Sequence, residues 1–387
     1  MNGRKGVFER MKMAIGKPDK IVWMHCASLG EFEQGRPLLE KIKLQFPSRK
    51  ILLTFFSPSG YEVSKDYKGA DFIFYLPMDS RQNAELFYEI VKPELVIFVK
   101  YEFWYFYLRE AKRRNIPLLL VSAIFRKNQP FFSTYNSFYK EMLHFFTHIF
   151  VQNEGSVSLL KTIGLFANVS FSGDTRFDRV IEIAQNFQPI VKIEAFCAGF
   201  PVIVAGSTWP EDDKVLAHFV NEQRVVKFII APHNVNKGRL KECLALYHHS
   251  ALFSSLSAMP PNSEIHTIII DNIGMLSRLY KYATIAYVGG GFGADGIHNV
   301  LEAAVYGKPV VFGPVYDRFI EADELIESGG GVSIKDPLQL EAELSKLFAN
   351  KSEYWKRAKA SLEYVNSKSG STEKIMQFIQ ENRLFTR

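Results

Sequence analysis

The stretch IVWMHCASLGEFEQGRPLLEKIKLQFPSRKILLTFF, residues 21–56, decides the fold. An apolar run at 21–27 leads through a turn of small residues into a helical pattern at 34–45, and a second apolar run begins at Lys50. Short apolar runs that alternate with amphipathic helices are typical of βαβ units in parallel sheets. The stretch therefore predicts an α/β fold.

The same alternation continues along the 387 residues, a length that suits about two domains of roughly 100–200 residues each. Further strands are predicted at 72–76, 95–99, 117–122, 148–152, 169–172, 201–205, 226–231, 265–271, 284–288, 309–312 and 331–334. The pattern loosens at 186–200, and the tail from 336 to 387 indicates helices. We predict two Rossmann-like, doubly wound domains over residues 1–190 and 191–387. The sequence leaves open whether the final helix packs back on the N-terminal domain.

Composition limits the classes of partner and cofactor. A net charge of +6 favours anionic partners but falls short of a nucleic-acid-binding signature. Cys26, Cys197 and Cys243 form no ligand pattern, which favours a reducing compartment without disulfides. Because the chain has no Asp-x-Asp motif, and His144 and His148 lack a third ligand nearby, we predict no metal. No apolar run approaches the roughly 18–20 residues that span a bilayer.

Aromatic residues gather in two segments, at 101–107 and 131–146. A stripe at helical spacing is more often core than membrane contact, but an enzyme with a lipid substrate leaves the membrane alternative open. The residues concerned are Tyr101, Phe103, Trp104, Tyr105, Phe106, Tyr107, Phe131, Phe132, Tyr135, Phe138, Tyr139, Phe145 and Phe146.

Ligands of open α/β sheets bind at the carboxyl ends of strands, and with two domains the cleft between them is the expected active site. The first strand ends in a loop that contains Gly30 and Glu31. Because a carboxylate is favoured in the first turn of a helix, Glu31 has a structural interpretation as well as a functional one as general base.

Two further loops of the first half follow strands. Ser57, Ser59 and Gly60 form a hydroxyl-rich turn that either caps a helix or binds an anion. Glu102 lies among aromatic residues, where an isolated carboxylate is costly. We expect it either to pair with a cation, such as Lys100 or Arg126, or to contact the substrate.

In the second half, the first strand runs into Gly206, Ser207 and Thr208 before a helix. Glycine and two hydroxyls at this point are suited to binding phosphate, although Ser and Thr are also common helix caps. The next strand ends at Pro232 and His233, which places a hydrogen-bond donor at the same edge of the sheet.

The glycine-rich stretch VGGGFGADGIHN, residues 288–299, includes Gly289 and Gly290. Its literal GxGxxG is discounted as a dinucleotide motif, because the preceding strand comes late in its domain. Asn299 and Glu302 share one helix face, where Glu302 can accept the ribose hydroxyls of a nucleotide. A solvated helix face is the alternative.

Together these motifs resemble the 3-deoxy-D-manno-octulosonic acid (Kdo) transferases, and the resemblance covers almost the whole chain. The motifs that carry it are residues 25–31, 57–60, 75–79, 102–104, 172–178, 206–208, 231–233 and 288–314. Where many members have Pro-Arg-His, this chain has Pro-His-Asn at 232–234, which leaves open the cation that meets the donor phosphate.

The resemblance implies a GT-B architecture of two Rossmann-like domains facing across a cleft. It implies transfer of Kdo from CMP-Kdo to the lipid A precursor lipid IVA, with inversion and with neither metal nor cofactor. It also implies a place at the cytoplasmic face of the inner membrane, either peripheral or through an anchor absent from this chain, and no nucleic-acid partner.

By motif match, Glu31 is the general base and Glu102 the next catalytic candidate. The implied nucleotide-binding residues are Gly206, Ser207, Thr208, Pro232, His233, Gly274, Met275, Gly289, Gly290, Asn299 and Glu302. The implied acceptor-binding residues are Gly30, Ser57, Ser59, Gly60 and Arg126.

Two alternatives stay open. One is a UDP-sugar-dependent GT-B glycosyltransferase or epimerase, against which the loop at Ser28–Glu31 argues. The other is a non-catalytic module that binds an anionic glycolipid or RNA. A pure binding module would require neither Glu31 nor a nucleotide half.

Overall fold

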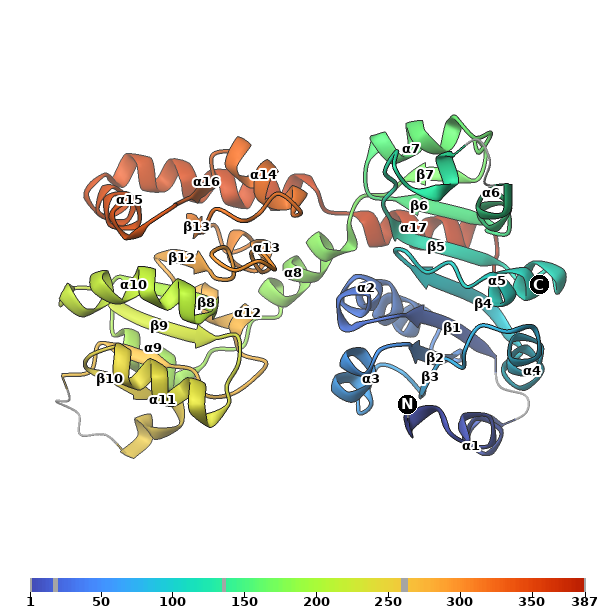
Figure 1. Cartoon of the computed structure of the whole chain (residues 1–387), viewed down its shortest axis with the longest axis horizontal. Coiled ribbons are helices and arrows are strands. Elements are labelled where there is room, and N and C mark those ends of the chain that lie inside the picture. The colour runs from blue at the N-terminus through green and yellow to red at the C-terminus, as the bar shows by residue number, and fades with distance from the viewer. Residues whose placement is uncertain (1, 17–19, 134–136, 259–263, 386–387) are drawn as a thin grey trace. The chain divides into compact units, whose positions relative to one another are not determined.

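The computed structural model describes residues 2–16, 20–133, 137–258 and 264–385. The chain forms two compact units, one of Met1–Arg179 with Lys368–Arg387 and one of Val180–Ser367. Figure 1 shows a sheet with helices on its faces in each unit. The sequence placed the domain boundary at 190/191, whereas the units divide within a continuous helix, Thr175–Gln185. Sequence patterns cannot locate a division inside a regular helix.

All strand pairs of the first unit are parallel, in the order β3-β2-β1-β4-β5-β6-β7. The strand order reverses between β1 and β4, and open α/β sheets bind ligands at such a switch point. The strands are β1 Ile21–Cys26, β2 Lys50–Phe55, β3 Phe72–Tyr75, β4 Pro93–Val99, β5 Leu118–Ala123, β6 His148–Val151 and β7 Val169–Phe171.

Helices cover both faces of this sheet (Figure 1). They are η1 Asn2–Arg4, α1 Val7–Ala14, α2 Leu29–Gln45, α3 Pro58–Ser64, α4 Arg81–Val91, α5 Tyr105–Arg113, η2 Pro130–Phe132, α6 Ser137–His144, α7 Glu154–Lys161, α8 Thr175–Gln185 and α17 Ser371–Glu381. Trp23 and Phe98 face a core shared with α4 and α5, while Met24 and Ile97 face the core on the opposite side of the sheet. This alternation follows from the period of two along a strand.

The last helix, α17, belongs to the first unit. Ile375, Met376 and Ile379 of this helix are fully buried in the core that also contains residues of α2. At its start, the backbone N–H groups of Gly370 and Thr372 each donate to the Asp178 carboxylate at 2.6 Å. The N-terminal unit is therefore completed by the last twenty residues of the chain, Lys368–Arg387.

The second unit repeats the design with the parallel order β10-β11-β9-β8-β12-β13-β14 and a switch point between β8 and β12. Its strands are β8 Val202–Thr208, β9 Lys227–Pro232, β10 Ser250–Leu252, β11 Thr267–Ile269, β12 Ile285–Val288, β13 Val310–Phe312 and β14 Gly331–Ser333. Its helices are α9 Val191–Cys197, α10 Pro210–Glu222, α11 Lys237–Leu246, η3 Phe253–Ala258, α12 Leu276–Leu279, η4 Tyr280–Tyr282, α13 Leu301–Ala304, α14 Ile320–Glu327, α15 Pro337–Ala349 and α16 Lys351–Ser367.

The predicted α/β fold with two doubly wound sheets is confirmed, and each predicted apolar run contains a strand. The edge strand β10, Ser250–Leu252, was not predicted. Within the described ranges, every helix is too short or too polar to cross a membrane.

Candidate functional site

Glu31 is the third residue of α2, which begins after the N-cap residue Ser28. One carboxylate oxygen, Oε2, accepts a hydrogen bond from the Ser28 backbone N–H at 2.8 Å and another from the Ser28 hydroxyl. This is a capping box, so Glu31 does perform the structural task expected of a first-turn acid. Both contacts use Oε2, and within the described residues Oε1 makes no hydrogen bond.

The loop before α3 lies against the loop before α2. The Ser57 hydroxyl accepts from the Gly60 backbone N–H at 3.4 Å and lies 2.7 Å from the Ser59 hydroxyl. A Cβ added at Gly60 would lie 2.9 Å from a ring atom of Phe55 and 3.1 Å from the Ser28 carbonyl carbon. Glycine is therefore needed at residue 60, because a side chain there would push apart the two loops that carry the predicted acceptor-binding residues.

Glu102 follows β4, across the switch point from the loop of Glu31. Its Oε2 accepts a hydrogen bond from the Trp104 indole N–H and lies 3.4 Å from His25 Nε2. The side chain is only 12% exposed. The sequence suggested Lys100 or Arg126 as cationic partners, whereas the observed partners come from an indole and from a buried imidazole on β1.

The charges of Glu31 and Glu102 both affect the pKa of the Cys26 thiol. Burial raises the pKa of Cys26 well above its usual value, and the carboxylates of Glu31 and Glu102 raise it further. Cys26 is the last residue of β1. The two predicted catalytic carboxylates therefore lie around one strand end.

Arg126, the remaining acceptor-side residue, is exposed after β5. Burial raises the pKa of the Tyr101 hydroxyl, whereas the nearby charges of Arg126 and Arg176 oppose this rise and the Glu31 carboxylate adds to it. Tyr101 thus lies between positive side chains and Glu31. This arrangement can receive an anionic group.

In the second unit, β8 ends in a strained turn. Ser207 has a φ of 53°, a left-handed conformation that is costly for a residue with a Cβ. The side chain of the next residue, Thr208, is fully buried, and its hydroxyl has no hydrogen-bond partner among the described residues. Strain and an unpaired hydroxyl at a strand end are typical of ligand sites.

The glycine-rich segment after β12 packs directly on this turn. The Gly289 N–H donates to the Gly206 carbonyl at 2.8 Å. A Cβ at Gly289 would collide with the Ser207 carbonyl oxygen and lie 2.8 Å from the Thr208 Cα. The first glycines of this segment are therefore required for the approach of two backbones at the switch point.

One buried carboxylate connects the two loops. Asp212 accepts hydrogen bonds from the Trp209 N–H, the Gly290 N–H and the Tyr287 hydroxyl, each at 2.8 Å. Burial raises the pKa of Asp212, and these three hydrogen bonds oppose the rise. Sequence reasoning missed Asp212, because Trp209 followed three residues later by Asp does not match the capping-box signature of Ser or Thr followed by Glu or Gln.

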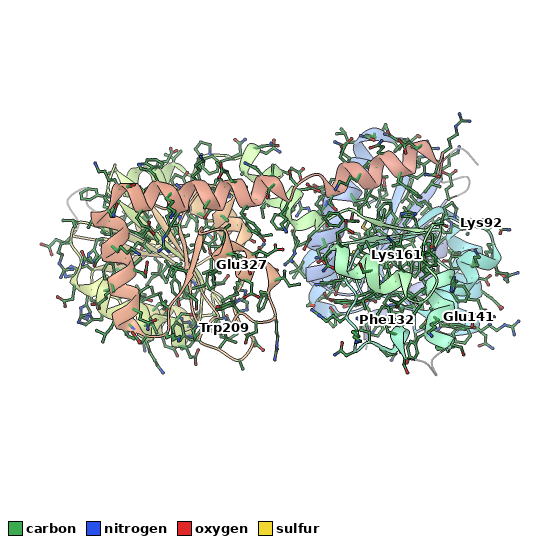
Figure 2. All side chains as sticks on the ribbon, turned by 90° about the horizontal axis from the view of Figure 1, so that it is seen from above. Lys92, Phe132, Glu141, Lys161, Trp209 and Glu327 are labelled. Carbon is green, nitrogen blue, oxygen red and sulfur yellow. The ribbon has the colours of Figure 1, made fainter. Side chains whose placement is uncertain are left out.

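The ring of His233 packs against two other rings. Its ring centroid lies 4.6 Å from that of Trp209, at the start of α10 (Figure 2), and 4.5 Å from that of His298. The Trp209 indole N–H donates to His298 Nε2 at 3.2 Å. Burial, and then the neighbouring His233, lower the pKa of His298 to about 4. His298 is therefore neutral at physiological pH, with its proton on Nδ1, and was missed by sequence reasoning.

The sequence predicted Asn299 and Glu302 on one helix face, whereas Asn299 lies before α13 and contacts Glu302, the second residue of that helix. The Asn299 side-chain amide donates to Glu302 Oε1 at 3.4 Å, and its carbonyl oxygen accepts from the Leu301 N–H at 3.1 Å. The Glu302 carboxylate also contributes to the raised pKa of Tyr280.

Gly274 and Met275 directly precede α12. A Cβ at Gly206 would lie 2.6 Å from the Leu276 side chain, which places the start of α12 beside the end of β8. The predicted nucleotide-binding residues therefore gather at the carboxyl ends of β8, β9 and β12. The predicted catalytic and acceptor-binding residues all lie in the first unit, and the predicted nucleotide-binding residues all lie in the second.

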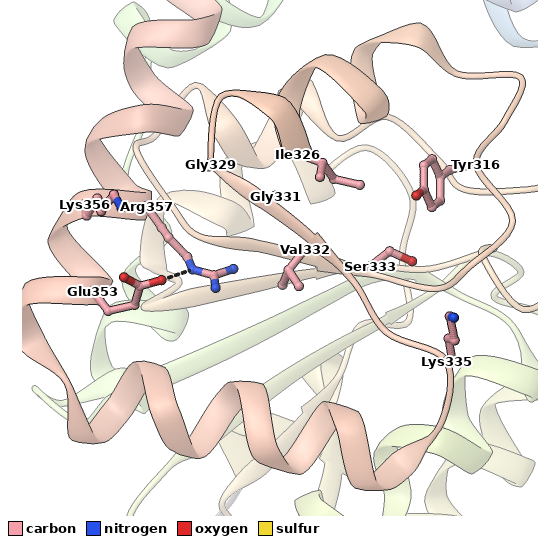
Figure 3. A pocket seen from close by; sticks show the side chains of 10 residues that line it. All are labelled: Tyr316, Ile326, Gly329, Gly331, Val332, Ser333, Lys335, Glu353, Lys356 and Arg357. Carbon is pink, nitrogen blue, oxygen red and sulfur yellow. Dashed lines mark hydrogen bonds and ion pairs between the residues drawn. The ribbon is translucent and has the colours of Figure 1, made fainter.

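A pocket of about 460 Å³ lies elsewhere in the second unit, beside β14 (Figure 3). Three basic side chains, Lys335, Lys356 and Arg357, line it, and Arg357 donates to Glu353 at 2.9 Å. None of the residues predicted from the sequence lines this pocket. Within the described ranges, no group of three His, Cys, Asp or Glu side chains is arranged to bind a metal ion.

Comparisons with known proteins cover both halves of the chain. Residues 5–179 match the family model of 3-deoxy-D-manno-octulosonic-acid transferase (kdotransferase). A 3-deoxy-D-manno-octulosonic acid transferase from Aquifex aeolicus is 29% identical over 338 residues, 86% of this chain and 87% of that enzyme. A bifunctional glycosyltransferase/methyltransferase from Fusobacterium nucleatum is 25% identical over 95% of this chain, which spans 56% of that longer protein.

A solved structure with a similar fold is UDP-GlcNAc 2-epimerase from Neisseria meningitidis bound to UDP-GlcNAc. It has a TM-score of 0.65 at 14% identity and covers 94% of this chain and 100% of its own. This likeness concerns the fold alone. Together with the two seven-stranded parallel sheets, it identifies the two-domain α/β fold as GT-B.

Proposed function

Because this chain belongs to the 3-deoxy-D-manno-octulosonic acid transferase family, it is a glycosyltransferase, and we propose that it transfers Kdo from CMP-Kdo to a lipid A precursor. The observation that carries the proposal is the pair of carboxylates, Glu31 and Glu102, at the switch point of the first unit. The first unit binds the acceptor, and the second binds the nucleotide.

In the proposed donor site, the phosphate of CMP lies at the end of β8, beside the unpaired hydroxyl of Thr208. The absence of side chains at Gly289 and Gly290 leaves room for it there. Glu302 accepts the ribose hydroxyls, and Asn299 orients its carboxylate through their contact at 3.4 Å. His233, stacked against two rings, takes the place of the arginine that the family pattern has. Hydroxyl and ring N–H groups are donors that suit an oxyanion.

In the proposed reaction, Glu31 removes the proton of the acceptor hydroxyl as its oxygen attacks the anomeric carbon of Kdo. The new C–O bond forms as the bond from that carbon to the CMP phosphate breaks, with inversion. Glu31 is suited to this role because capping holds Oε2 and leaves Oε1 for the proton. A positioned base contributes about 10²–10⁴-fold to such a step.

The acceptor is a glycolipid, so we propose that the enzyme works at the cytoplasmic face of the inner membrane. Phe138 and Tyr139 on α6 support this, because they are 48% and 38% exposed. Tyr107, Phe131, Phe145 and Phe146 of the same aromatic segments are buried core residues, and Tyr135 lies outside the described residues. The proposed membrane contact therefore involves Phe138 and Tyr139 rather than the buried residues of the aromatic segments.

The decisive test combines the purified chain with CMP-Kdo and lipid IVA and measures the mass of the product. We expect the mass of lipid IVA to increase by one or more Kdo residues. A parallel thermal-shift measurement compares CMP with UDP, and we expect only CMP to raise the melting temperature. Stabilisation by UDP without Kdo transfer would favour the UDP-sugar alternative.

A further inference from the structure

A fully buried carboxylate, that of Asp212, lies between the two loops of the second unit that carry the proposed donor site. Asp212 is the third residue of α10, and its Oδ2 accepts from the backbone N–H groups of Trp209 and Gly290, each at 2.8 Å. Its other oxygen, Oδ1, accepts from the Tyr287 hydroxyl on β12 at 2.8 Å. Both oxygens of this carboxylate therefore accept hydrogen bonds from the protein.

A helix cap alone does not account for these contacts. An acidic side chain at this position usually reaches back only to the N-cap backbone N–H, as Asp212 does to Trp209. The contacts to Gly290 and Tyr287 instead span 78 and 75 residues along the chain. Because a buried carboxylate is costly unless donors surround it, the three hydrogen bonds favour one arrangement of α10, β12 and the glycine-rich segment.

Gly290 begins the turn of the glycine-rich segment. It has a φ of 94°, and its carbonyl oxygen accepts from the Gly293 N–H at 3.0 Å. The preceding carbonyl oxygen, that of Gly289, accepts from the His298 N–H at 3.0 Å. A shift of Gly290 would therefore move both this turn and His298.

Trp209, the second backbone held by Asp212, directly follows Thr208. The buried Thr208 hydroxyl has no hydrogen-bond partner in the part of the chain that the structure describes. The Trp209 ring is stacked on that of His233, with 4.6 Å between the centroids, and its indole N–H donates to His298 Nε2 at 3.2 Å. The two side chains proposed for the phosphate, Thr208 and His233, are therefore both neighbours of a residue that Asp212 holds.

We propose that Asp212 is a positioning residue for the donor nucleotide, because it holds the backbones of Trp209 and Gly290 in the arrangement that the phosphate of CMP requires. This inference rests on the proposed function. The Gly290 N–H is occupied by Asp212, so this amide does not itself bind the phosphate. Asp212 acts only through the residues that it holds, and its effect should appear in CMP affinity as well as in stability.

Two substitutions at Asp212 differ in the contacts that they keep. Asp212→Ala removes the acceptor of both N–H groups, and we expect CMP affinity to fall about tenfold or more at a temperature where the variant is folded. Asp212→Asn should keep CMP affinity within about threefold of the wild type, because its carbonyl oxygen can replace Oδ2 while its amide donates to the Tyr287 hydroxyl oxygen.

Asp178→Ala is the matched control in the first unit. Asp178 also accepts from two backbone N–H groups at a helix start, those of Gly370 and Thr372, each at 2.6 Å. We expect this variant to have a lower melting temperature than the wild type and the same CMP affinity. Isothermal calorimetry with CMP and thermal unfolding measure the two quantities for all three variants.

Wild-type CMP affinity of Asp212→Ala would overturn the proposal. An equal loss in Asp212→Asn would also overturn it, because asparagine keeps both N–H contacts, and so would an equal loss in Asp178→Ala, because lower stability alone would then explain the effect. Should Asp212→Ala fail to fold, Asp212→Ser replaces it with the same loss expected, since a serine hydroxyl is too short to reach the Gly290 N–H.

Amide hydrogen exchange tests the contact without any nucleotide. In Asp212→Ala, the amides of Trp209 and Gly290 should exchange faster than in the wild type, whereas in Asp212→Asn they should exchange as in the wild type. Unchanged exchange of both amides in Asp212→Ala would overturn the proposal even if CMP binds and Kdo is transferred. Absence of CMP binding and of Kdo transfer in the wild type would instead contradict the proposed function, and faster exchange in Asp212→Ala would still show that Asp212 holds the two loops.

Discussion

At the residue scale, the proposed site depends on carboxylates that have a structural task in the fold and a proposed role in the chemistry. Glu31 closes a capping box and Glu102 accepts from the Trp104 indole N–H, and each uses only Oε2 for its structural contacts. A carboxylate held by one oxygen has a defined orientation, which general-base catalysis requires.

Replacing Glu31 with glutamine should lower Kdo transfer by a hundredfold or more, within the range of about 10²–10⁴ typical of a general base. Glutamine also serves at the third position of a capping box, so the melting temperature should stay nearly unchanged. Steady-state kinetics and calorimetry check both expectations. Glu33→Gln is the control, because Glu33 pairs with Arg36 on the helix surface. Wild-type turnover of Glu31→Gln would leave this residue as a helix cap only.

Glu302→Ala should weaken CMP binding by about 1.5–3 kcal/mol, the usual contribution of a hydrogen bond to a charged group. The reason is the loss of the carboxylate that Asn299 orients towards the ribose. Isothermal calorimetry with CMP measures the change. Glu327→Ala, on the exposed end of α14, should bind CMP as the wild type does. Equal affinity of both variants would remove Glu302 from the nucleotide site.

At the scale of elements, the proposed donor site lies where two strand ends meet. β8 and β12 are adjacent, and their following loops touch through Gly206 and Gly289. Asp212 then joins the start of α10 to Gly290. The proposed site therefore depends on the close contact between the backbones of these two loops as much as on side chains.

Gly289→Ala should abolish detectable CMP binding, because its Cβ would collide with the Ser207 carbonyl and push the two strand ends apart. Gly293→Ala is a matched control in the same segment, since its nearest neighbour would be the Gly290 oxygen at 3.5 Å, an ordinary contact. Calorimetric titration of both variants with CMP is the measurement. A Gly289→Ala protein with full affinity would show that the loops need no such approach.

The exposed aromatic residues of α6 provide an element-scale test of membrane binding. Replacing Phe138 and Tyr139 with serine should reduce co-sedimentation with vesicles of anionic phospholipid, because exposed aromatic side chains insert at the interface. Phe166, which is 64% exposed outside these segments, supplies the control substitution Phe166→Ser. Equal vesicle binding by the double variant and the control would exclude α6 as the contact.

At the scale of the whole molecule, the chain passes from the first unit to the second and returns. The returning segment is Lys368–Arg387, and α17 within it fills the core beside α2. The stability of the N-terminal unit therefore depends on a segment that follows the whole second unit in the sequence.

Ile379→Ala, in the core of the first unit, should lower the free energy of unfolding by about 2–5 kcal/mol, as for other large-to-small core substitutions. CMP affinity should be unchanged, because the predicted nucleotide-binding residues all lie in the second unit. Denaturant unfolding and calorimetry measure the two quantities. Gln377→Ala, on the exposed side of α17, is the control. Loss of CMP binding in Ile379→Ala at a temperature where the protein is folded would contradict this separation.

The sequence by itself determined the α/β class, every described strand except β10 and the loops that carry the candidate site. It could do so because these are local properties: a buried parallel strand is a continuous apolar run, and the residues after it lie at the ligand-binding edge. Only the tertiary structure decided which side chains meet. His25 contacts Glu102 and Asp212 contacts Gly290 across long separations in sequence, and α17 returns to the first unit. Such contacts depend on strand order and on the path of the chain in space, which periodicity along the sequence does not encode.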